Sequence, residues 1–448
     1  MFQKVLIANR GEIAVRIIQA CRDLGGLSVA GDSEADREAL HAQIADEAVC
    51  IGPARAADSY LNMDNIISAA LASGCQAIHP GFGFLSENPD FAERTTQAGL
   101  AFIGPTAATI RLMGDKSEAK RNAIAAGVPV ALGTDGPLRD FDEALSEAER
   151  IGYPVMLKAA SGGGGKGIRV AKDVRGLKDA YDSAAAEAVA NFGDGRLYME
   201  KYIENQRHIE VQILGDSFGN VVHLFERECS VQRSHQKLIE ESPSAFVTPE
   251  LRAKMTKAAV DLAKRVGYRN AGTIEFLVDS DRNFYFCEMN TRIQVEHPVT
   301  EQVTGVDLVC EQIRVAAGEP LSFTQDDLEL RGHAIECRIN AEDPSRDFAP
   351  CPGTLVSMHL PGGPGVRMDT AAYQGYKIPP FYDSMIGKLI VYGADRQQAI
   401  ARMRRALAET LFEGVVTGTD YQMHILRSKA FEDAEFNVNS IANGDFDR

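Results

Sequence analysis

Hydrophobic and polar residues alternate in two neighbouring runs in the second half of the chain. Residues 273–278 and 283–289 are rich in apolar, β-branched and aromatic side chains, and the short polar segment 279–282 separates them. This pattern predicts a β-hairpin. A polar or charged group then stands at every second position of residues 288–296. If that segment is extended, one face carries Glu288, Asn290, Arg292, Gln294 and Glu296. The row favours a chemical role, although a solvated outer strand with alternating charge would give the same pattern.

The predicted hairpin brings two carboxylates together. If it closes symmetrically about Asp281 and Arg282, Glu275 lies directly opposite Glu288. At about 5 Å and an effective dielectric constant of roughly 20, two such charges repel each other by about 3 kcal/mol. A bound cation would relieve the repulsion, and oxygen ligands of this kind suit magnesium or manganese.

Strand and helix patterns alternate in the first part of the chain, which predicts an α/β fold. A strand over 4–8 is followed by a helix over 12–24 and a strand over 27–30, with later strands at 77–79 and 101–103. We expect these elements to form a first domain.

A second domain is expected to begin near residue 115. Asp115, with Glu118 three residues later, is a capping-box pattern, and Gly127 with Pro129 ends the helix that it opens. Short strands are expected after this helix over 155–159, 168–170, 197–202, 210–214 and 221–225.

Two later helices have clear start signals. Thr248 with Pro249 starts a helix that Gly267 ends. Asp395 caps another helix, which is expected to run to about Phe412.

The segment 161–167, SGGGGKG, is the second informative motif. It contains a GxGxxG match, but strand-like residues follow where a dinucleotide-binding motif needs a helix, and the Walker spacing is not met. Successive glycines between two strands leave backbone N–H groups free to approach an anion, and Lys158 and Lys166 add positive charge nearby. A mobile lid over phosphate groups fits best, and a flexible surface hairpin is the alternative.

Composition excludes several classes of protein. The chain has 448 residues, of which 45% are hydrophobic and 25% charged, as is normal for a globular enzyme of about three domains. A net charge of −16, without a long basic stripe, argues against nucleic-acid binding. No leader-like start or membrane-length apolar run is visible, so we expect a cytoplasmic protein that binds no membrane. The eight cysteines contain no CxxC pair, which argues against zinc and against a disulfide framework.

Six strings together make the chain similar to biotin carboxylase of the ATP-grasp superfamily. They are IANRGEIA at 7–14, HPGFGFLSEN at 79–88, MGDK at 113–116, ERECSVQR at 226–233, EMNTRIQVEHP at 288–298 and GHAIECR at 332–338. The resemblance covers essentially the whole chain. It implies a three-domain α/β ATP-grasp architecture: an N-terminal α/β domain (1–114), an ATP-grasp domain (115–330) with a hinged lid at about 131–203, and a C-terminal α+β domain (331–448). It also implies that ATP activates bicarbonate as carboxyphosphate, which carboxylates the biotin ureido nitrogen.

The resemblance assigns residues to an ATP and metal site. Lys116 and Lys158 resemble phosphate-binding lysines, and the Gly164–Gly165 backbone would cover the phosphates. The adenine hinge would be Glu200, Lys201, Tyr202 and Ile203. His208, Gln232 and His235 would lie near the ribose and phosphates. Glu275, Glu288 and Asn290 match ligands for Mg²⁺ or Mn²⁺, at two expected sites, in agreement with the hairpin register.

The resemblance also assigns a bicarbonate and biotin site. Lys237, Arg292, Gln294 and the Val295 backbone match the bicarbonate site, because a planar guanidinium can hold a carbonate-like anion at two points. Glu296 matches the base that deprotonates bicarbonate. Arg338 matches the group that stabilises the enolate-like charge on biotin, against which Phe82 would stack.

Three departures from the family pattern stand out. Phe82 occupies a position where Tyr is common, so a hydroxyl near biotin is missing while the stacking surface remains. The pair at 31–32, Gly-Asp, replaces a more apolar pair. At the homodimer contact, Gln19 and Pro364 stand where some relatives carry a basic residue and an aromatic, whereas Arg16 and Arg367 are present.

The expected function is the first half-reaction of an acetyl-CoA carboxylase, which supplies malonyl-CoA for fatty acid synthesis. The chain contains no Met-Lys-Met biotin acceptor, so we expect biotin to come from a carrier protein, with separate carboxyltransferase subunits and a homodimer. The biotin carboxylase subunit of a split pyruvate or propionyl-CoA carboxylase remains an alternative. A non-catalytic regulatory paralogue is a weaker alternative. Bicarbonate-dependent ADP release would distinguish the enzyme from such a paralogue.

Overall fold

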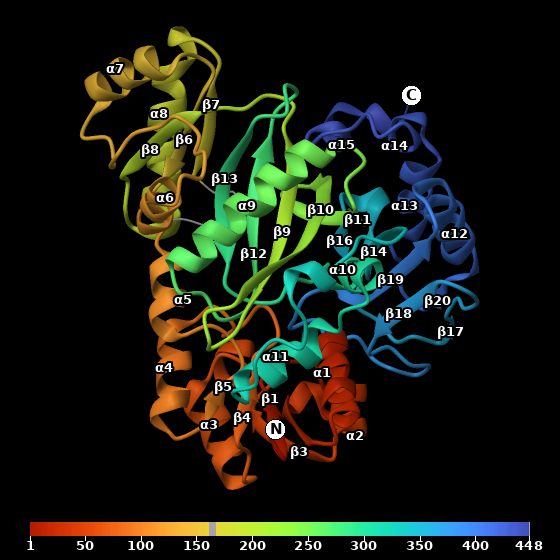
Figure 1. The fold of residues 1–448 in the computed structure, drawn as a ribbon. Helices are drawn as coiled ribbons and strands as arrows, with labels where there is room; N and C mark the ends of the chain where they lie inside the picture. The colour runs from red at the N-terminus through yellow and green to blue at the C-terminus, as the bar shows by residue number, and fades with distance from the viewer. Residues whose placement is uncertain (161–166, 448) are drawn as a thin grey trace.

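The N-terminal part of the chain is a parallel sheet flanked by helices. The computed structural model describes residues 1–160 and 167–447, and Figure 1 shows this part at the bottom in red and orange. The strand order is β3-β2-β1-β4-β5. The strands are β1 (Lys4–Ile7), β2 (Leu27–Ser33), β3 (Glu47–Gly52), β4 (Ala77–His79) and β5 (Ala101–Phe102). The helices are α1 (Gly11–Asp23), α2 (Leu40–Ile44), α3 (Met63–Ala72), α4 (Pro89–Gln97) and α5 (Ala107–Gly114). The mixed α/β prediction is confirmed.

Both faces of this parallel sheet are covered. Leu6 and Ile7 are neighbours on β1 and therefore point to opposite faces. Ile7 packs in one apolar cluster with Ile17 of α1, and Leu6 packs in another with Ile66 of α3. This explains why the strand is an unbroken apolar run.

A small antiparallel sheet lies apart at the upper left of Figure 1. It has the order β7-β6-β8. Its elements are α6 (Lys116–Ala125) and α7 (Phe141–Ile151) before and beside it, β6 (Val155–Ala159), β7 (Ile168–Ala171), α8 (Val174–Phe192) and β8 (Leu197–Lys201). Leu157, Leu177 and Met199 are fully buried between the sheet and its helices. Gly164, Gly165 and Lys166 of the predicted glycine loop lie outside the described residues.

The largest sheet has eight strands in the order β13-β12-β9-β10-β11-β14-β19-β18. They are β9 (Arg207–Gly215), β10 (Val221–Arg233), β11 (Gln236–Ser242), β12 (Asn270–Val278), β13 (Phe284–Asn290), β14 (His333–Asn340), β18 (Val366–Thr370) and β19 (Met385–Gly393). α9 (Pro249–Arg265) covers its front in Figure 1, and α10 (His297–Thr304) and α11 (Leu308–Ala316) follow the hairpin. The sheet runs without a break through β11 and β14, across residue 330.

The last part of the chain adds helices to the far end of this sheet. They are α12 (Arg396–Glu409), α13 (Thr419–Arg427), α14 (Lys429–Glu432) and α15 (Ser440–Asn443). Short strands complete it: β15 (Glu342–Asp343), β16 (Ala349–Pro350), β17 (Ser357–His359) and β20 (Leu411–Glu413). The prediction that the helix after Asp395 reaches Phe412 was wrong. Phe412 pairs with Met358 in a two-stranded sheet, so the backbone is already extended there.

The predicted helix starts are observed. Asp115 accepts hydrogen bonds from the backbone N–H groups of Ser117 and Glu118, and Thr248 and Asp395 cap their helices in the same way. The Glu118 side chain, which would complete the capping box, instead forms an ion pair with Arg121, three residues later in the helix.

The hairpin register was predicted correctly at the end away from the turn. Glu275 on β12 is the cross-strand partner of Glu288 on β13. Nearer the turn the register shifts by one residue, and Phe276 pairs with Phe286. Cys287 is therefore the additional residue of a β-bulge, which the symmetric closure did not include.

The extended interpretation of residues 288–296 was wrong beyond Asn290. β13 ends there, the chain turns, and α10 begins at His297 with Glu296 at its N-cap position. The Thr291 N–H donates a hydrogen bond to Glu87 at 2.9 Å instead of continuing the ladder. The polar side chains still meet, but through turns and not along one strand face.

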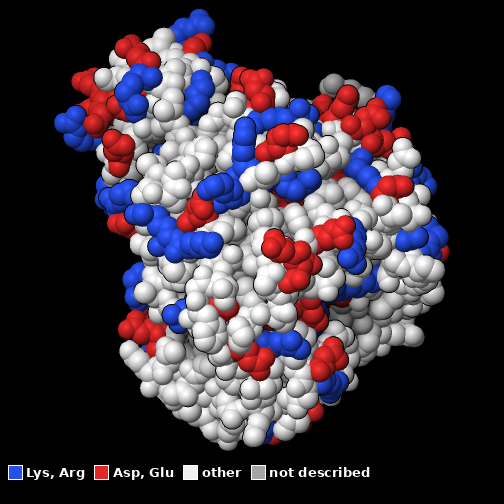
Figure 2. Space-filling model, in the orientation of Figure 1, with Lys and Arg blue, Asp and Glu red and all other residues white. Residues whose placement is uncertain are grey.

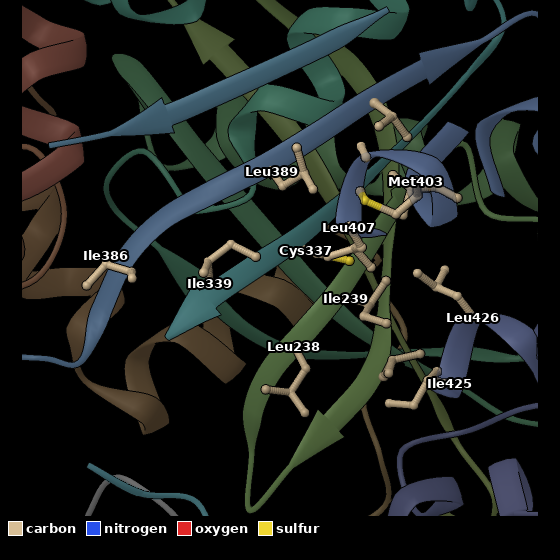
Figure 3. Close-up of a cluster of buried hydrophobic side chains, with 14 of the residues drawn as sticks. Leu238, Ile239, Cys337, Ile339, Ile386, Leu389, Met403, Leu407, Ile425 and Leu426 are labelled. Atoms are coloured by element: carbon tan, nitrogen blue, oxygen red, sulfur yellow. The ribbon is translucent and has the colours of Figure 1, made fainter. Parts of the chain in front are cut away.

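The two faces of β11, β14 and β19 differ in character. Figure 3 shows Ile239, Cys337 and Leu389, one from each strand, among the apolar side chains of α12 and α13. Residues next to these in sequence point to the other face. They are Glu240, Glu336, Arg338 and Lys388, all buried or nearly so. The face opposite the apolar core thus carries charge.

The remaining sequence predictions concern cysteines, membranes and surface charge. All eight cysteines are free thiols. Within residues 1–160 and 167–447, no helix is both long enough and apolar enough to cross a bilayer. Acidic and basic side chains are interspersed on the face drawn in Figure 2.

Candidate active site

Lys237 on β11 lies at the centre of a cluster of carboxylates. Its Nζ is 2.6 Å from Glu210 Oε2, 2.6 Å from Glu296 Oε1 and 3.0 Å from Glu275 Oε1. Burial lowers the pKa of Lys237, but Glu210 and Glu275 outweigh it and hold the pKa well above its ordinary value. The lysine is therefore a permanent cation beneath the site.

A second buried cation, Arg227, contacts the carboxylate cluster through Glu210. Arg227 on β10 has no exposed side-chain surface, and its Nε is 2.5 Å from Glu210 Oε1. Its two terminal nitrogens donate to Gln212, Thr300 and Thr273 at 2.7, 2.9 and 3.0 Å. Every arm of the guanidinium is satisfied, as a buried charge requires. The sequence interpretation missed this residue.

Glu296 connects Lys237 with Arg338. Its Oε2 is 3.0 Å from Arg338, while its Oε1 contacts Lys237, and the side chain is fully buried. Burial raises the pKa of Glu296, but Lys237 and Arg338 outweigh it and keep the pKa well below its ordinary value. Glu296 is thus ionised at neutral pH, which is the form that can accept a proton.

Arg292 extends the network toward the N-terminal part of the chain. Its Nε donates to Glu87 Oε2 at 3.0 Å, and its terminal nitrogens donate to Gln294 Oε1 at 2.8 Å and Asn290 Oδ1 at 3.1 Å. Gln294 in turn donates to Glu275 Oε1 at 3.1 Å. The side chains predicted for bicarbonate are therefore linked without interruption from Arg292 to Arg338.

Lys388 on β19 holds the backbone beside Glu296. Its Nζ donates to the Val295 carbonyl at 2.9 Å and lies 3.1 Å from Glu12 of α1. It is also 5.8 Å from the centre of the Phe82 ring. This fully buried lysine, which sequence interpretation missed, fixes two predicted site residues relative to each other. A charged residue inside the apolar run at 385–393 was the available signal.

The two predicted carboxylate ligands fit a divalent cation. Asn290 Nδ2 donates to Glu275 Oε1 at 3.0 Å, and His208 Nε2 lies 3.0 Å from Glu275 Oε2. Burial raises the pKa of Glu275, but Lys237 and His208 outweigh it and hold the pKa far below its ordinary value. Glu288 lies at the exposed side of the pair, where the surrounding protein and Glu275 raise its pKa. A cation would relieve the charge that Glu288 feels from Glu275.

Lys158 on β6 contacts the predicted adenine hinge. Its Nζ is 2.6 Å from Glu200 Oε2 on β8, and Lys120 is 3.4 Å from Glu200 Oε1. The backbone N–H groups of Lys201 and Tyr202 already donate to protein carbonyls at 2.7 and 3.1 Å. Lys116 lies at the first position of α6. Both of these N–H groups of the predicted hinge therefore already have protein partners.

Two other predicted residues lie on the β10–β11 hairpin. Gln232 is buried and pairs across the hairpin with Lys237. His235 is exposed in the turn, at a φ of 66°. No described contact joins His235 to the Lys237 cluster within residues 1–160 and 167–447, so its predicted place near the phosphates stays a prediction.

Comparisons with known families divide the chain into three matches. Residues 1–110 match "Biotin carboxylase, N-terminal domain", residues 115–324 match "Carbamoyl-phosphate synthase L chain, ATP binding domain", and residues 336–443 match "Biotin carboxylase C-terminal domain". Among proteins, "Biotin carboxylase 1" of Bacillus subtilis is 54% identical over 446 residues, which are 99% of each chain. A pyruvate carboxylase subunit of Methanothermobacter thermautotrophicus is 55% identical over 441 residues, 98% of this chain and 90% of that protein.

Solved structures agree with these matches. A biotin carboxylase complex with β-γ-ATP from Campylobacter jejuni has a TM-score of 0.95 and 49% identity, with 99% of each chain covered. The biotin carboxylase domain dimer of the Hydrogenobacter thermophilus 2-oxoglutarate carboxylase, with MgADP, ADP and bicarbonate, has a TM-score of 0.93 and 50% identity, over 99% of this chain and 98% of that one.

The fold is therefore that of an ATP-grasp protein, and the class of enzyme is an ATP-dependent ligase. The chain belongs to the biotin carboxylase family. The weaker alternative, a non-catalytic paralogue, gains no support from membership in this family.

Proposed function

We propose that the chain performs the first half-reaction of an acetyl-CoA carboxylase, the ATP-dependent carboxylation of biotin on a carrier protein. The observation that carries the proposal is the unbroken network from Arg292 through Gln294, Glu275, Lys237 and Glu296 to Arg338. It places Lys237 and Arg338 on either side of Glu296, a buried and ionised carboxylate. An anion-binding site with its own base needs this combination.

Bicarbonate binds among the cations of this network. Lys237, Arg292, Gln294 and the Val295 N–H hold the anion, and Glu296 accepts its proton. The Lys388 contact with the Val295 carbonyl holds the next peptide, between Val295 and Glu296, beside the one that carries this N–H. Binding of the anion offers Lys237 a further negative partner beside the carboxylates that it contacts now.

Biotin binds at the Arg338 end of the network. The Arg338 guanidinium stabilises the negative charge that develops on the ureido oxygen, while Phe82 stacks against the ring. The contact between Arg338 and Glu296 brings the two halves of the reaction next to each other. Arg292, Lys237, Glu296 and Arg338 are the proposed catalytic residues.

ATP binds between the small lid sheet and the hairpin. Lys116, Lys158 and the Gly164–Gly165 backbone would hold the phosphates, Glu200 to Ile203 the adenine, and His208, Gln232 and His235 the remaining nucleotide. Glu275, Glu288 and Asn290 would hold Mg²⁺ or Mn²⁺, at two sites. When bound, the metal neutralises phosphate oxygens during transfer.

The test uses the chain alone with free biotin. Bicarbonate and biotin together should stimulate ADP release, because the whole carboxylation site lies within this chain. Matched reactions without biotin and without bicarbonate give the background. Absence of stimulation over a wide range of biotin concentrations would contradict the proposal.

Partner proteins follow from the half-reaction. A biotin carboxyl carrier protein presents the biotin, and carboxyltransferase subunits pass the carboxyl group to acetyl-CoA for fatty acid synthesis. The similarity to a pyruvate carboxylase subunit favours a keto acid as the second candidate acceptor. Turnover of acetyl-CoA or pyruvate with the purified partner subunits decides between them.

We also propose a homodimer. Arg16 and Arg367 both bind Glu301, at 3.1 and 2.7 Å, so one carboxylate organises both arginines of the expected contact surface. Sedimentation at assay concentrations should give the dimer mass, and a monomer would refute this part. The domain division at 114/115 and 330/331 and a cytoplasmic site of action remain predictions.

A further inference from the structure

Two buried carboxylates face each other behind Arg338. Glu240 on β11 and Glu336 on β14 are direct cross-strand partners, and neither side chain is exposed. Side chains at such positions lie on the same face of the sheet, about 5 Å apart at Cβ. Glu240 Oε1 accepts a hydrogen bond from Arg338 Nε at 2.6 Å.

The other three oxygens of this pair have no partner. Glu240 Oε2 and both oxygens of Glu336 are buried without a hydrogen-bond donor among the described residues. A buried carboxylate without donors is costly, and two carboxylates facing each other cannot both stay ionised there. A proton shared between the two residues removes one of the two charges and pairs two of the three oxygens, because one carboxyl group then donates to the other.

The surroundings decide which residue carries the proton. The charged and titratable groups near the pair are Lys237 on β11, Arg338 on β14, Lys388 on β19, Glu296 before α10, and the thiols of Cys229 and Cys337. Burial raises the pKa of Glu240 to about 7 and raises that of Glu336 well above its ordinary value. Of the two glutamates, Glu240 is the one with a guanidinium in hydrogen-bond contact, so the anion resides on Glu240 and the proton on Glu336.

We propose that Glu336 is a positioning residue that donates a hydrogen bond to Glu240 Oε2 and thereby leaves the Arg338 charge available for biotin. This inference rests on the proposed function of Arg338. A hydrogen bond from Glu336 withdraws negative charge from Glu240, so Glu240 neutralises the positive charge of the Arg338 guanidinium less strongly. If Glu336 loses this proton, Glu240 turns its full negative charge toward Arg338. The interaction of Arg338 with the ureido oxygen then weakens.

Two substitutions of Glu336 distinguish the effect of its hydrogen bond from the effect of its side-chain volume. Glu336→Gln keeps a donor that cannot ionise, so biotin-dependent turnover at neutral pH should stay within about twofold, and its decline at alkaline pH should disappear. Glu336→Leu removes the donor, and biotin-dependent kcat should fall by about tenfold, as expected for one lost hydrogen bond to a charged group. Glu241→Gln is the matched control, because Glu241 is also buried in β11 but pairs with Arg396 and His333.

Infrared spectroscopy tests the proton without any assay of activity. Burial also raises the pKa of Glu12 to about 7, so the comparison uses difference spectra, in which Glu12 cancels. At pH 7 the wild-type chain should show a band of a buried protonated carboxyl group that Glu336→Gln lacks and Glu241→Gln keeps. No such band in the wild type, or equal pH profiles for Glu336→Gln and the wild type, would overturn the inference. A band in a wild-type chain that shows no biotin-stimulated turnover would refute the proposed function while supporting the shared proton.

Discussion

Two pairs of glutamates occupy the same geometric position in neighbouring parts of one sheet, yet their charges are handled differently. Glu275 and Glu288 face each other across β12 and β13, and Glu240 and Glu336 face each other across β11 and β14. The first pair opens onto the exposed side of the hairpin, whereas the second is sealed.

The difference shows that partners, and not strand geometry, determine what a carboxylate pair can do. Glu275 receives hydrogen bonds from Lys237, Asn290 and Gln294, which leaves Glu288 as the charge that a metal ion can compensate. Among the described residues, Arg338 is the one donor to the sealed pair, and burial closes that pair to a hydrated ion. A proton is small enough to compensate one of the two charges of this buried pair.

Removing Glu296 should have the largest effect, since this residue contacts Lys237 on one side and Arg338 on the other. Glu296→Ala removes the proposed base for bicarbonate, so carboxybiotin formation and bicarbonate-dependent ATP cleavage should both be lost. The two products are measured separately, as labelled carboxybiotin and ADP. Retention of bicarbonate-dependent ADP release would contradict the role as base.

Arg338→Met should affect the biotin half of the reaction selectively. The substitution keeps much of the bulk but removes a charge worth roughly 3 to 4 kcal/mol to the transition state, so carboxybiotin formation should fall by about two to three orders of magnitude. Slow bicarbonate-dependent ATP cleavage without biotin should still be detectable. Equal loss of both products would place Arg338 in the bicarbonate site.

Substitutions in the open pair should change the metal requirement. Glu275→Gln and Glu288→Gln each remove one proposed anionic ligand, and the concentration of Mg²⁺ or Mn²⁺ needed for half-maximal turnover should rise by about tenfold or more. Glu329→Gln, at an exposed glutamate that pairs with Arg331, is the control. Unchanged metal dependence in both variants would refute the predicted metal site.

The neighbours Glu240 and Glu241 should respond to pH with opposite signs. Arg396 and His333 overcome burial and lower the pKa of Glu241 to about 2, so its stabilisation of about 3 kcal/mol is present above pH 4.5 and lost as pH falls toward 2. Burial raises the pKa of Glu240 to about 7, so its contribution becomes unfavourable as pH rises from 4.5 to 7.

Urea unfolding of Glu240→Gln and Glu241→Gln measures this contrast. At pH 8, Glu241→Gln should lower the free energy of unfolding and Glu240→Gln should raise it or leave it unchanged. The deficit of Glu241→Gln should shrink below pH 4.5. Equal destabilisation by both substitutions at pH 8 would show that the sealed pair is held by ionic partners after all.

The smallest effect is expected at Phe82. Phe82→Tyr adds a hydroxyl next to the proposed biotin position, and the KM for biotin should fall by about two- to tenfold, the value of one hydrogen bond. The KM for bicarbonate serves as the internal control, because the proposed bicarbonate contacts do not include this ring. An unchanged KM for biotin would place the ring away from the ureido group.

Local sequence patterns predicted the elements and the hairpin register, because they depend on neighbouring residues. Asp115, Thr248 and Asp395 begin helices as their side chains indicate, and Glu275 faces Glu288 as the turn dictates. The error at Phe412 arose because a strand partner far away in the sequence, Met358, competes with helix continuation.

The parts of the site that sequence could not predict depend on contacts between distant segments. Lys388 meets Glu12 across more than three hundred residues, and Arg227 reaches Thr300 from another element. Nothing local in either string specifies these partners. Charges within apolar strand runs, such as Glu336 and Lys388, were the signal that a buried polar network exists, without revealing which residues compose it.

The unbroken sheet across residue 330 limits how relatives of this chain can be recombined. β11 comes from the segment before that point and β14 from the segment after it, and Arg338 crosses the seam to reach Glu240 and Glu296. A hybrid joined there would combine two halves of the proposed catalytic network from different parents. A fragment ending there would leave β11 as an unpaired sheet edge that can pair with other chains. Functional chimeras should therefore exchange the lid, whose small sheet is separate, and inherit the eight-stranded sheet from a single parent.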